Sequence, residues 1–287
     1  MKKKLSLLLA LALAFSIPIA ATATTTPEIE WSKSFGGSGY DSVISSQQTT
    51  DGGYIMAVQS DSNDGDVTGN HGGYDYWIVK LTKSGAISWS KCLGGSGSDD
   101  VYGIQQTSDG GYIAAGASGS KDGDVAGNHG GYDAWIVKLT SNGEISWSKC
   151  LGGSNADCAY SIQQTNDGGY IVAGVSNSND GDVSGNHGYN DYWVVKLNSN
   201  GEISWSKCLG GSGFDGTRII QQTRDGGYCA ACYSDSTDGD ITKNHGIVDY
   251  WVAKFDNNVI YKTSRLSGGF YLYKIWGSVN NFVQTNI

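Results

Sequence analysis

The sequence predicts an all-β fold, a β-propeller-like array of four-stranded antiparallel blades, and three observations lead to this prediction. First, tryptophan recurs every 58 residues in two registers, at Trp31, Trp89, Trp147 and Trp205, and at Trp77, Trp135, Trp193 and Trp251. Second, the chain has 43 Gly and only 2 Pro, which suits short strands joined by tight turns. Third, no segment has a sustained helical periodicity of apolar residues.

Each copy contains the same segments in the same order. It reads W-S-K-x-[FL]-G-G-S, an Asp three residues on, a variable segment ending in Q-T, D-G-G-Y, an apolar strand, D-G-D, N-H-G and D-x-W-[IV]-[VA]-K-[LF]. Gly, Asp and Asn turn residues separate these segments, so each copy holds four strands. In the second copy we expect them at about 87–93, 101–107, 111–117 and 134–140.

The last strand of each copy indicates how the copies pack. In the second copy Trp135, Val137 and Leu139 share one face of this strand, and Ile136 and Lys138 share the other. Both faces are largely apolar, so both are expected to be covered. Stacked propeller blades cover both faces of a repeated four-stranded unit. A β-solenoid would need much shorter coils, and a sandwich would not need four near-identical copies.

Two segments of the second copy resemble a known family. W-S-K-C-L-G-G-S-G-S-D at 89–99, followed by D-G-G-Y-I-A-A-G at 109–116, is similar to the bacterial secreted β-propeller repeat. The resemblance extends over residues 29–262 and implies a toroid of four-stranded blades in exported or surface proteins that share no single activity. The chain has D-G-D and N-H-G where many such repeats have Phe-Pro, so properties of that loop are not carried over.

The predicted organisation is a signal peptide followed by one repeat domain. Residues 1–23 combine three lysines, an apolar run at 5–15 and small residues before a cleavage site after Ala23, which predicts a secreted or cell-surface protein. No later stretch is apolar enough to span a membrane. Residues 24–287 form the single domain, with repeats at approximately 31–88, 89–146, 147–204, 205–262 and a partial fifth at 263–287.

The partial fifth copy leaves the closure of the ring open. Gly268 and Gly269 stand 58 residues after Gly210 and Gly211, but Thr263 replaces the expected Trp. The copies either close as a five-bladed ring, with residues 29–35 as a latch strand, or remain an open arc. An open arc exposes strand edges, which favours a homo-oligomer or indicates a truncated fragment of a larger surface protein.

Charge and cysteine placement limit the partners and the crosslinks. A net charge of −9 without a basic patch excludes nucleic acid. Cys92, Cys150 and Cys208 occupy one repeat position, a blade apart, so disulfides between them are not expected. Export would permit other pairings among the six cysteines.

The D-G-D turns are candidate calcium ligands. Two carboxylates separated by one Gly can converge on a hard cation, and the Asn of N-H-G offers a further oxygen slightly downstream. The alternative is that these side chains cap their own turns. The candidate residues are Asp64, Asp66, Asp122, Asp124, Asp180, Asp182, Asp238 and Asp240.

Histidine, a second set of aspartates and a set of tyrosines also recur near the loops. One His per blade cannot surround a zinc ion, so His71, His129, His187 and His245 are expected to be hydrogen-bonded loop residues. The same Asp in every copy does not distinguish an acid from a base, so turn or inter-blade hydrogen bonds are expected for Asp41, Asp99, Asp157 and Asp215. A tyrosine cluster beside N-H-G offers a candidate site for sugar recognition, although packing between blades with satisfied hydroxyls is the preferred interpretation of Tyr74, Tyr76, Tyr132, Tyr189, Tyr192 and Tyr250.

The function expected from these observations is binding. The sequence contains no G-x-S-x-G, no P-loop and no H-E-x-x-H motif. We therefore predict a cell-surface or extracellular binding or adhesion scaffold with a protein or glycan partner. The alternatives are a carbohydrate-binding lectin or carbohydrate-active hydrolase on a five-bladed propeller, and a truncated fragment of a larger surface protein.

Overall fold

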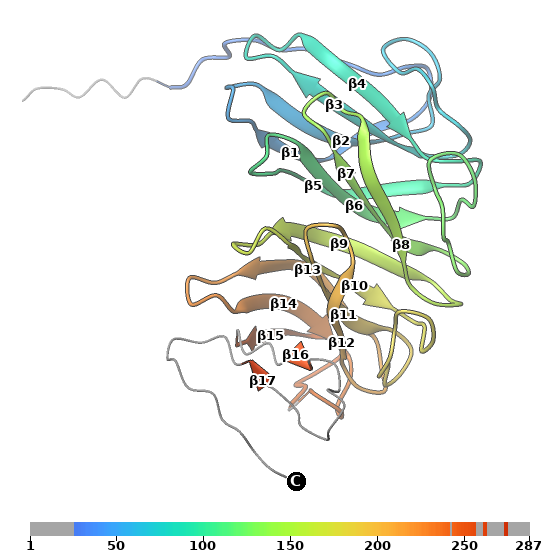
Figure 1. Cartoon of the computed structure of the whole chain (residues 1–287), viewed down its shortest axis with the longest axis vertical. Helices are drawn as coiled ribbons and strands as arrows, with labels where there is room; N and C mark the ends of the chain where they lie inside the picture. Colours follow the sequence, from blue (N-terminus) through green and yellow to red (C-terminus); the bar gives the residue numbers. More distant parts are fainter. Residues whose placement is uncertain (1–25, 242, 257–260, 263–272, 275–287) are drawn as a thin grey trace, which may run out of the picture. The chain divides into compact units, whose positions relative to one another are not determined.

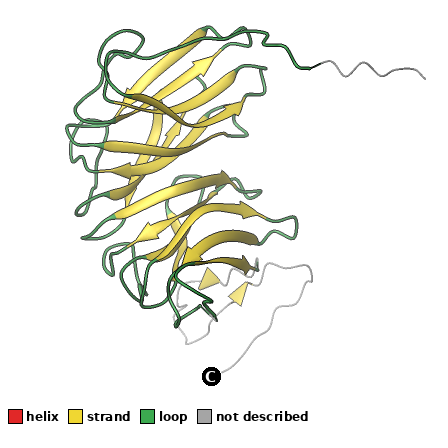
Figure 2. Cartoon of the chain, turned by 180° about the vertical axis from the view of Figure 1, so that it is seen from behind, coloured by secondary structure: helices red, strands yellow, loops and turns green. Residues whose placement is uncertain are grey.

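The computed structural model describes residues 26–241, 243–256, 261–262 and 273–274. The chain divides into two compact units, residues 1–32 and residues 33–287, and each is described by itself. The described residues of the first unit contain no strand, and every strand belongs to the second unit (Figure 2). The described residues contain no helix, and hence no helix that could cross a membrane. The predicted signal peptide and most of the partial fifth copy lie outside the described residues.

The second unit consists of antiparallel sheets that follow one another along the chain (Figure 1). The first contains β1 (Asp41–Gln48), β2 (Tyr54–Ser60), β3 (Asp75–Leu81) and β4 (Ile87–Leu93). The second contains β5 (Asp99–Gln106), β6 (Tyr112–Ser118), β7 (Asp133–Leu139) and β8 (Ile145–Leu151). The third contains β9 (Asp157–Gln164), β10 (Tyr170–Ser176), β11 (Asp191–Leu197) and β12 (Ile203–Leu209). The fourth has three strands, β13 (Asp215–Gln222), β14 (Tyr228–Ser234) and β15 (Asp249–Phe255), and β16 (Tyr261–Lys262) pairs with β17 (Tyr273–Lys274).

The structure confirms the all-β, propeller-like array of four-stranded antiparallel blades. The strands of the second copy differ from the prediction by one or two residues at their ends. Their grouping is different, however. The W-S-K strand at 87–93 is the last strand of the first sheet rather than the first strand of the second. Each complete sheet therefore takes its fourth strand from the following copy.

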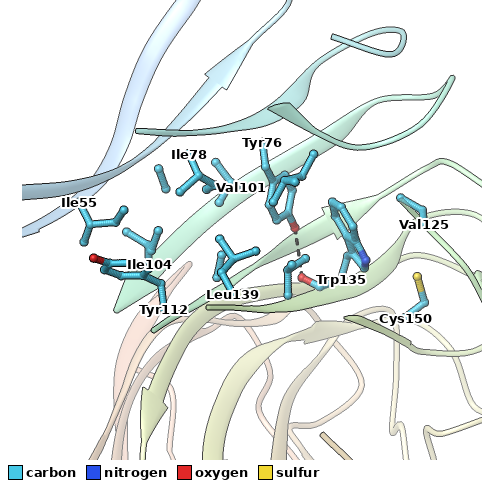
Figure 3. Close-up of a cluster of buried hydrophobic side chains, with 14 residues drawn as sticks. Ile55, Tyr76, Ile78, Val101, Ile104, Tyr112, Val125, Trp135, Leu139 and Cys150 are labelled. Carbon is cyan, nitrogen blue, oxygen red and sulfur yellow. Dashed lines mark hydrogen bonds between the residues drawn. The ribbon is translucent and has the colours of Figure 1, made fainter. Parts of the chain in front are cut away.

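Consecutive sheets pack through large side chains (Figure 3). Trp135, Val137 and Leu139 lie in one buried cluster with Tyr76 and Ile78 of the preceding sheet. The Tyr76 hydroxyl donates a hydrogen bond of 3.1 Å to the backbone oxygen of Trp135, and the two rings lie 4.7 Å apart. These contacts bury Tyr76 and Trp135 completely, at 0% exposure. Tertiary packing of this kind holds the array together.

The opposite face of the same strand is also buried. Ala134 and Ile136 belong to the next cluster along the chain, together with Val172 and Trp193 of the third sheet. The prediction that both faces of this strand are covered is confirmed. Each inner sheet is therefore a layer with apolar contacts on two sides, which no single copy can provide alone.

Glutamine side chains also join the first strands of consecutive sheets. Gln47 Oε1 accepts a hydrogen bond of 2.7 Å from the backbone N–H of Gln106, and Gln106 Oε1 accepts one of 2.9 Å from Thr50 N–H. Equivalent pairs of bonds recur at the next two junctions. This glutamine ladder satisfies backbone N–H groups that the sheets themselves leave without a partner.

The hairpin turns of the D-G-G-Y motif hold a buried lysine. Asp109 Oδ1 accepts bonds from Thr107 Oγ1 at 2.5 Å and from Gly111 N–H at 3.0 Å. Its Oδ2 lies 2.9 Å from Lys138 Nζ, and the Lys138 side chain is only 6% exposed. Partial burial opposes ionisation of Asp109, but the bonds from Thr107, Lys138 and Gly111 outweigh it and hold its pKa at about 2.

The tryptophan of β4, β8 and β12 contacts the next sheet. The Trp89 ring lies 5.7 Å from that of Tyr112, and Trp89 Nε1 donates a bond of 3.2 Å to Ser141 O. Gly143, with a φ of +81°, presses against this indole, and a Cβ atom there would lie 2.8 Å from the ring. Gly127 has a similar φ of +83° but no atom within 4 Å of a Cβ position.

We expect Gly143→Ala to destabilise the protein more than Gly127→Ala. Both variants force Ala into the left-handed region at a cost of about 1 kcal/mol, and only Gly143→Ala also displaces Trp89, at a further ~1–3 kcal/mol. Urea unfolding followed by tryptophan fluorescence measures both. Equal midpoints for the two variants would show that the Trp89 contact contributes nothing.

We expect Asp109→Asn to lower the stability at neutral pH by about 1 kcal/mol, because the buried Lys138 ammonium loses its counter-charge while an acceptor oxygen is retained. The folded pKa is lowered, so this contribution is present above the unfolded pKa of 3.8 and disappears as the pH falls towards about 2. Thermal unfolding between neutral and acidic pH measures the difference. Glu144→Gln, at the exposed Lys91–Glu144 pair, is the control and should change little.

Candidate functional site

The D-G-D turns bind the backbone of the neighbouring G-G-S turn. In the second copy Asp122 Oδ1 accepts a bond of 2.7 Å from Ser96 N–H, and Asp124 Oδ2 accepts one of 3.3 Å from Gly94 N–H. The other copies repeat both bonds, with Asp64 and Asp66, Asp180 and Asp182, and Asp238 and Asp240 as acceptors. The carboxylates thus connect two loops of one sheet junction.

In the structure these aspartates connect two loops through hydrogen bonds, and calcium binding by them is not tested. The bond from Ser96 lowers the pKa of Asp122 below its usual value, which keeps the acceptor ionised. Across the described ranges, no group of three or more His, Cys, Asp or Glu side chains converges as a metal site requires. Calcium at the eight candidate aspartates therefore stays a prediction.

The aspartates after G-G-S and the histidines form the hydrogen bonds expected of them. Asp99 is 0% exposed and accepts bonds from Ser118 Oγ, from Ser120 Oγ at 2.9 Å and from Gly95 N–H at 2.8 Å. The equivalent serines also bond Asp41 and Asp157. Each His bonds the Asp four residues later, with Nδ1–Oδ2 distances of 2.6–2.7 Å. Both predictions of hydrogen-bonded loop residues are confirmed.

Buried carboxylates face one another at the sheet junctions. Asp75 and Asp99 are both 0% exposed, and a Cβ atom on Gly94 would lie 2.5 Å from Asp75 Oδ1 and 2.6 Å from Asp99 Oδ2. Burial raises the pKa of Asp75 against the bonds from His71, and Asp99 raises it further. Neither oxygen is accessible to a glycosidic bond. This pair therefore does not form the accessible acid and base that a hydrolase needs.

An open groove of about 510 Å³ lies between the second and third sheets. Its lining includes the ionisable side chains His129, Lys149, Asp182 and Glu202. His129, Lys149 and Asp182 stand at repeat positions where every copy has the same residue type. In steps of 58 residues, these positions run from 71 to 245 for His, from 33 to 207 for Lys and from 66 to 240 for Asp. A residue that all copies retain serves the fold, so the groove is a weaker candidate for a specific site.

The variable segments contain a feature that sequence reasoning missed. The first strands β1, β5, β9 and β13 each have a β-bulge, and the extra residue of each bulge has no partner in the ladder. Bulges re-aim side chains and are common beside functional sites. The four extra residues share one repeat position but differ in type, and we call them the bulge row: Ile44, Tyr102, Tyr160 and Arg218.

Three members of the bulge row contact one another across three sheets. The rings of Tyr102 and Tyr160 lie 4.8 Å apart at an interplanar angle of 49°. The guanidinium carbon of Arg218 lies 5.1 Å from the centre of the Tyr160 ring. Contacts between β5 and β9 and between β9 and β13 bring these strands together. The result is a continuous surface of two phenol rings and one stacked guanidinium.

Polar groups flank the bulge row. Gln59 Nε2 donates a hydrogen bond to Asp100 Oδ1, and burial raises the pKa of Asp100. Burial also raises the pKa of Tyr160 to about 12 and that of Cys158 to about 11, and the two side chains are hydrogen-bonded. Arg218 is exposed, and in the part of the chain that the structure describes it forms no ion pair.

The tyrosines beside N-H-G divide between the two interpretations, packing between blades and exposure to a ligand. Tyr76 and Tyr192 are 0% exposed because they pack between sheets, whereas Tyr132, Tyr189 and Tyr250 are 37%, 72% and 87% exposed. A Tyr next to a polar loop gives no sequence signal of this burial. A half-buried tyrosine pair that spans two sheets, Tyr102 with Tyr160, lies outside the predicted set.

All six cysteines are free thiols in the structure. Cys92, Cys150 and Cys208 are buried, and burial raises the pKa of each thiol to about 12. These three sulfurs are therefore poor nucleophiles.

Comparisons with known proteins do not assign this chain to a family. No family model matches the chain, and a search of curated proteins finds no significant relative.

We expect Asp122→Ala to lower the midpoint of thermal unfolding, because Ser96 N–H loses its acceptor. Asp122→Asn retains an oxygen and should stay closer to wild type. Differential scanning calorimetry measures both midpoints. Equal midpoints for Ala and Asn would contradict this structural role.

The calcium prediction requires a separate titration. Isothermal calorimetry of the chelator-treated protein with CaCl₂ should give heat if the D-G-D turns bind calcium, and Asp122→Asn should reduce that heat. Titration without heat, and without a shift of the unfolding midpoint, would exclude calcium at these turns.

Proposed function

We propose that this protein is an exported binding scaffold and that its bulge row binds a glycan. The observation that supports this proposal is the convergence of Tyr102, Tyr160 and Arg218 at the one bulged position where the copies differ. Constant positions build the array, as the D-G-D and His–Asp bonds do. A position that changes from copy to copy, yet brings its side chains into contact, is the better candidate for a ligand site.

The chemistry of the bulge row suits a sugar. The Tyr102 and Tyr160 rings are half-buried, which fixes them while leaving part of each ring accessible. An aromatic ring offers an apolar face with a polar edge, and a pyranose has apolar C–H faces with hydroxyls around its rim. The stacked Arg218 guanidinium provides several N–H donors, and Asp100 provides an acceptor at the other end.

The row suits an extended ligand rather than a small one. Tyr102, Tyr160 and Arg218 belong to β5, β9 and β13, so a ligand that contacts all three spans three consecutive sheets. Linked sugar units would each contact one sheet, and the contacts would reinforce one another as in multivalent binding. A net charge of −9 disfavours a polyanion as the ligand. We therefore expect a neutral or weakly acidic oligosaccharide.

The location that we propose rests on the N-terminal sequence. Lys2, Lys3 and Lys4 precede the apolar run at 5–15, as in secretory signal peptides. The resemblance to bacterial secreted propeller repeats supports the same location. A protein outside the cell meets polysaccharides at cell surfaces, which fits a binding or adhesion role.

We expect Tyr160→Ala to weaken oligosaccharide binding roughly fivefold, because one stacking contact worth about 1 kcal/mol is lost. Tyr160→Phe retains the ring and removes only the hydroxyl bond to Cys158, so it should bind nearly as wild type does. A glycan array identifies the ligand, and calorimetry measures the affinity of each variant.

The outcome that would contradict this assignment is a glycan that binds wild type and both variants equally, since the bulge row would then not form the site. Lys149→Ala tests the groove between the second and third sheets in the same assay. No binding across plant, host and microbial glycans would favour a protein partner.

A further inference from the structure

In the described residues, the fourth sheet has an unpaired strand edge at β15. In each of the three preceding sheets, a fourth strand pairs with the corresponding edge. β15 pairs with β14, and in the described residues no strand pairs with its other edge, whereas β3, β7 and β11 each pair with a W-S-K strand there. β16 begins at the register position where a fourth strand is expected, yet it pairs with β17. A free strand edge presents N–H and C=O groups to any strand that can align with it.

One face of the same sheet is exposed as well. Tyr250 and Val252 are 87% and 56% exposed, whereas Tyr76 and Ile78, at the same repeat positions, are 0% exposed. The Asp249 side chain is 32% exposed, against 0% for Asp75. At the inner junctions these positions lie under the next sheet. Among the described residues, the end of the array thus has the surface of an inner junction without its second half.

Residues 29–35 have the sequence of the missing strand. They read I-E-W-S-K-S-F, and β4, β8 and β12 read I-S-W-S-K-C-L. Residues 36–40 connect this segment to β1, and residues 94–98 connect β4 to β5 with the same length. The segment forms no strand in the structure. It therefore has the composition and the spacing of a fourth strand followed by a next sheet.

We propose that residues 29–35 of one molecule pair with β15 of a second copy, whose fourth sheet they complete. The first sheet of the donor molecule then covers Tyr250 and Val252 of the acceptor. The register follows from the inner sheets, where Trp89 lies opposite Lys80 and Lys91 opposite Ile78. By the same register Trp31 lies opposite Lys254 and Lys33 opposite Val252 of the second copy.

The reach of the segment favours a second copy over the same molecule. Five residues separate Phe35 from β1, and five extended residues span at most about 17 Å. Within the described second unit, extensive contacts join only consecutive sheets, and none joins the first sheet to the fourth. Pairing within one molecule would require the array to close. A second copy can pair without closure of the array.

Such pairing joins two different surfaces, a donor segment and an acceptor edge. Each molecule has both, so a dimer retains one free donor and one free acceptor. Head-to-tail contacts of this kind produce oligomers that grow with concentration unless the rotation closes a ring.

The test uses the chain from Thr24 onward in light scattering coupled to size exclusion, over a series of concentrations. The variant Ser32→Pro combined with Lys33→Pro removes two consecutive backbone N–H groups from the donor segment. Consecutive N–H groups of a strand point to opposite sides, so one donor is lost on each side. Both residues lie outside the strands of the fold. Ser32→Ala combined with Lys33→Ala is the matched control. Thermal unfolding verifies that all three proteins are folded.

We expect concentration-dependent oligomers for wild type and the alanine control, and a monomer for the proline variant. A synthetic peptide of residues 28–36 should bind the proline variant with one peptide per chain and dissociate wild-type oligomers when in excess. Wild-type protein that stays monomeric at every concentration would overturn the proposal. This also holds if slow hydrogen exchange at β15 indicates that the array closes within one molecule. Equal oligomerisation of wild type and the proline variant would also overturn it.

Discussion

The exchange of the W-S-K strand between copies is the constraint on which the rest of the structure depends. β4 closes the first sheet, and only five residues separate its end from β5, so the position of one sheet determines where the next begins. Trp89 strengthens this dependence because it lies on β4 but contacts Tyr112 and Ser141 of the second sheet. Stability is therefore shared between neighbours, as in other repeat proteins, rather than held within single sheets.

Repeat positions that hold the same residue in every copy stabilise this array, whereas the variable bulge position takes no part in its backbone pairing. The constant aspartates and histidines satisfy loop N–H groups and serine hydroxyls at each junction, and Tyr76 and Trp135 fill the space between two sheets. The bulge position lies outside the ladder of backbone pairs, so a change from Tyr to Arg there breaks no sheet hydrogen bond. The side chain at this position can therefore vary without altering the pairing of the strands.

The sequence was sufficient to predict the fold class, the approximate positions of the strands and the burial of both faces of β7. Period-two alternation in Trp135, Ile136 and Val137 predicted that both faces are buried, and the two clusters confirm this. The grouping of strands into sheets was not predictable, because a 58-residue period is the same wherever the first residue of the unit is placed. Hydrogen bonding alone decides that 87–93 belongs with β3.

The candidate site was less predictable than the fold. Its bulges have no local marker, since Tyr102 and Arg218 are not residues that interrupt strands. Their proximity depends on packing between strands that are 58 residues apart in sequence. The burial of Tyr76 and Tyr192 has the same origin, because a tyrosine beside a polar loop looks exposed until the next sheet covers it.

The glutamine ladder has a consequence for how such a chain can evolve. Gln47 and Gln106 each accept a bond from the neighbouring sheet, and both residues recur at the same positions in every copy. Any copy therefore offers the same acceptors and donors to whichever copy adjoins it. Recombination that adds or removes one 58-residue unit joins two compatible ends, so the gene can change its number of blades in a single step.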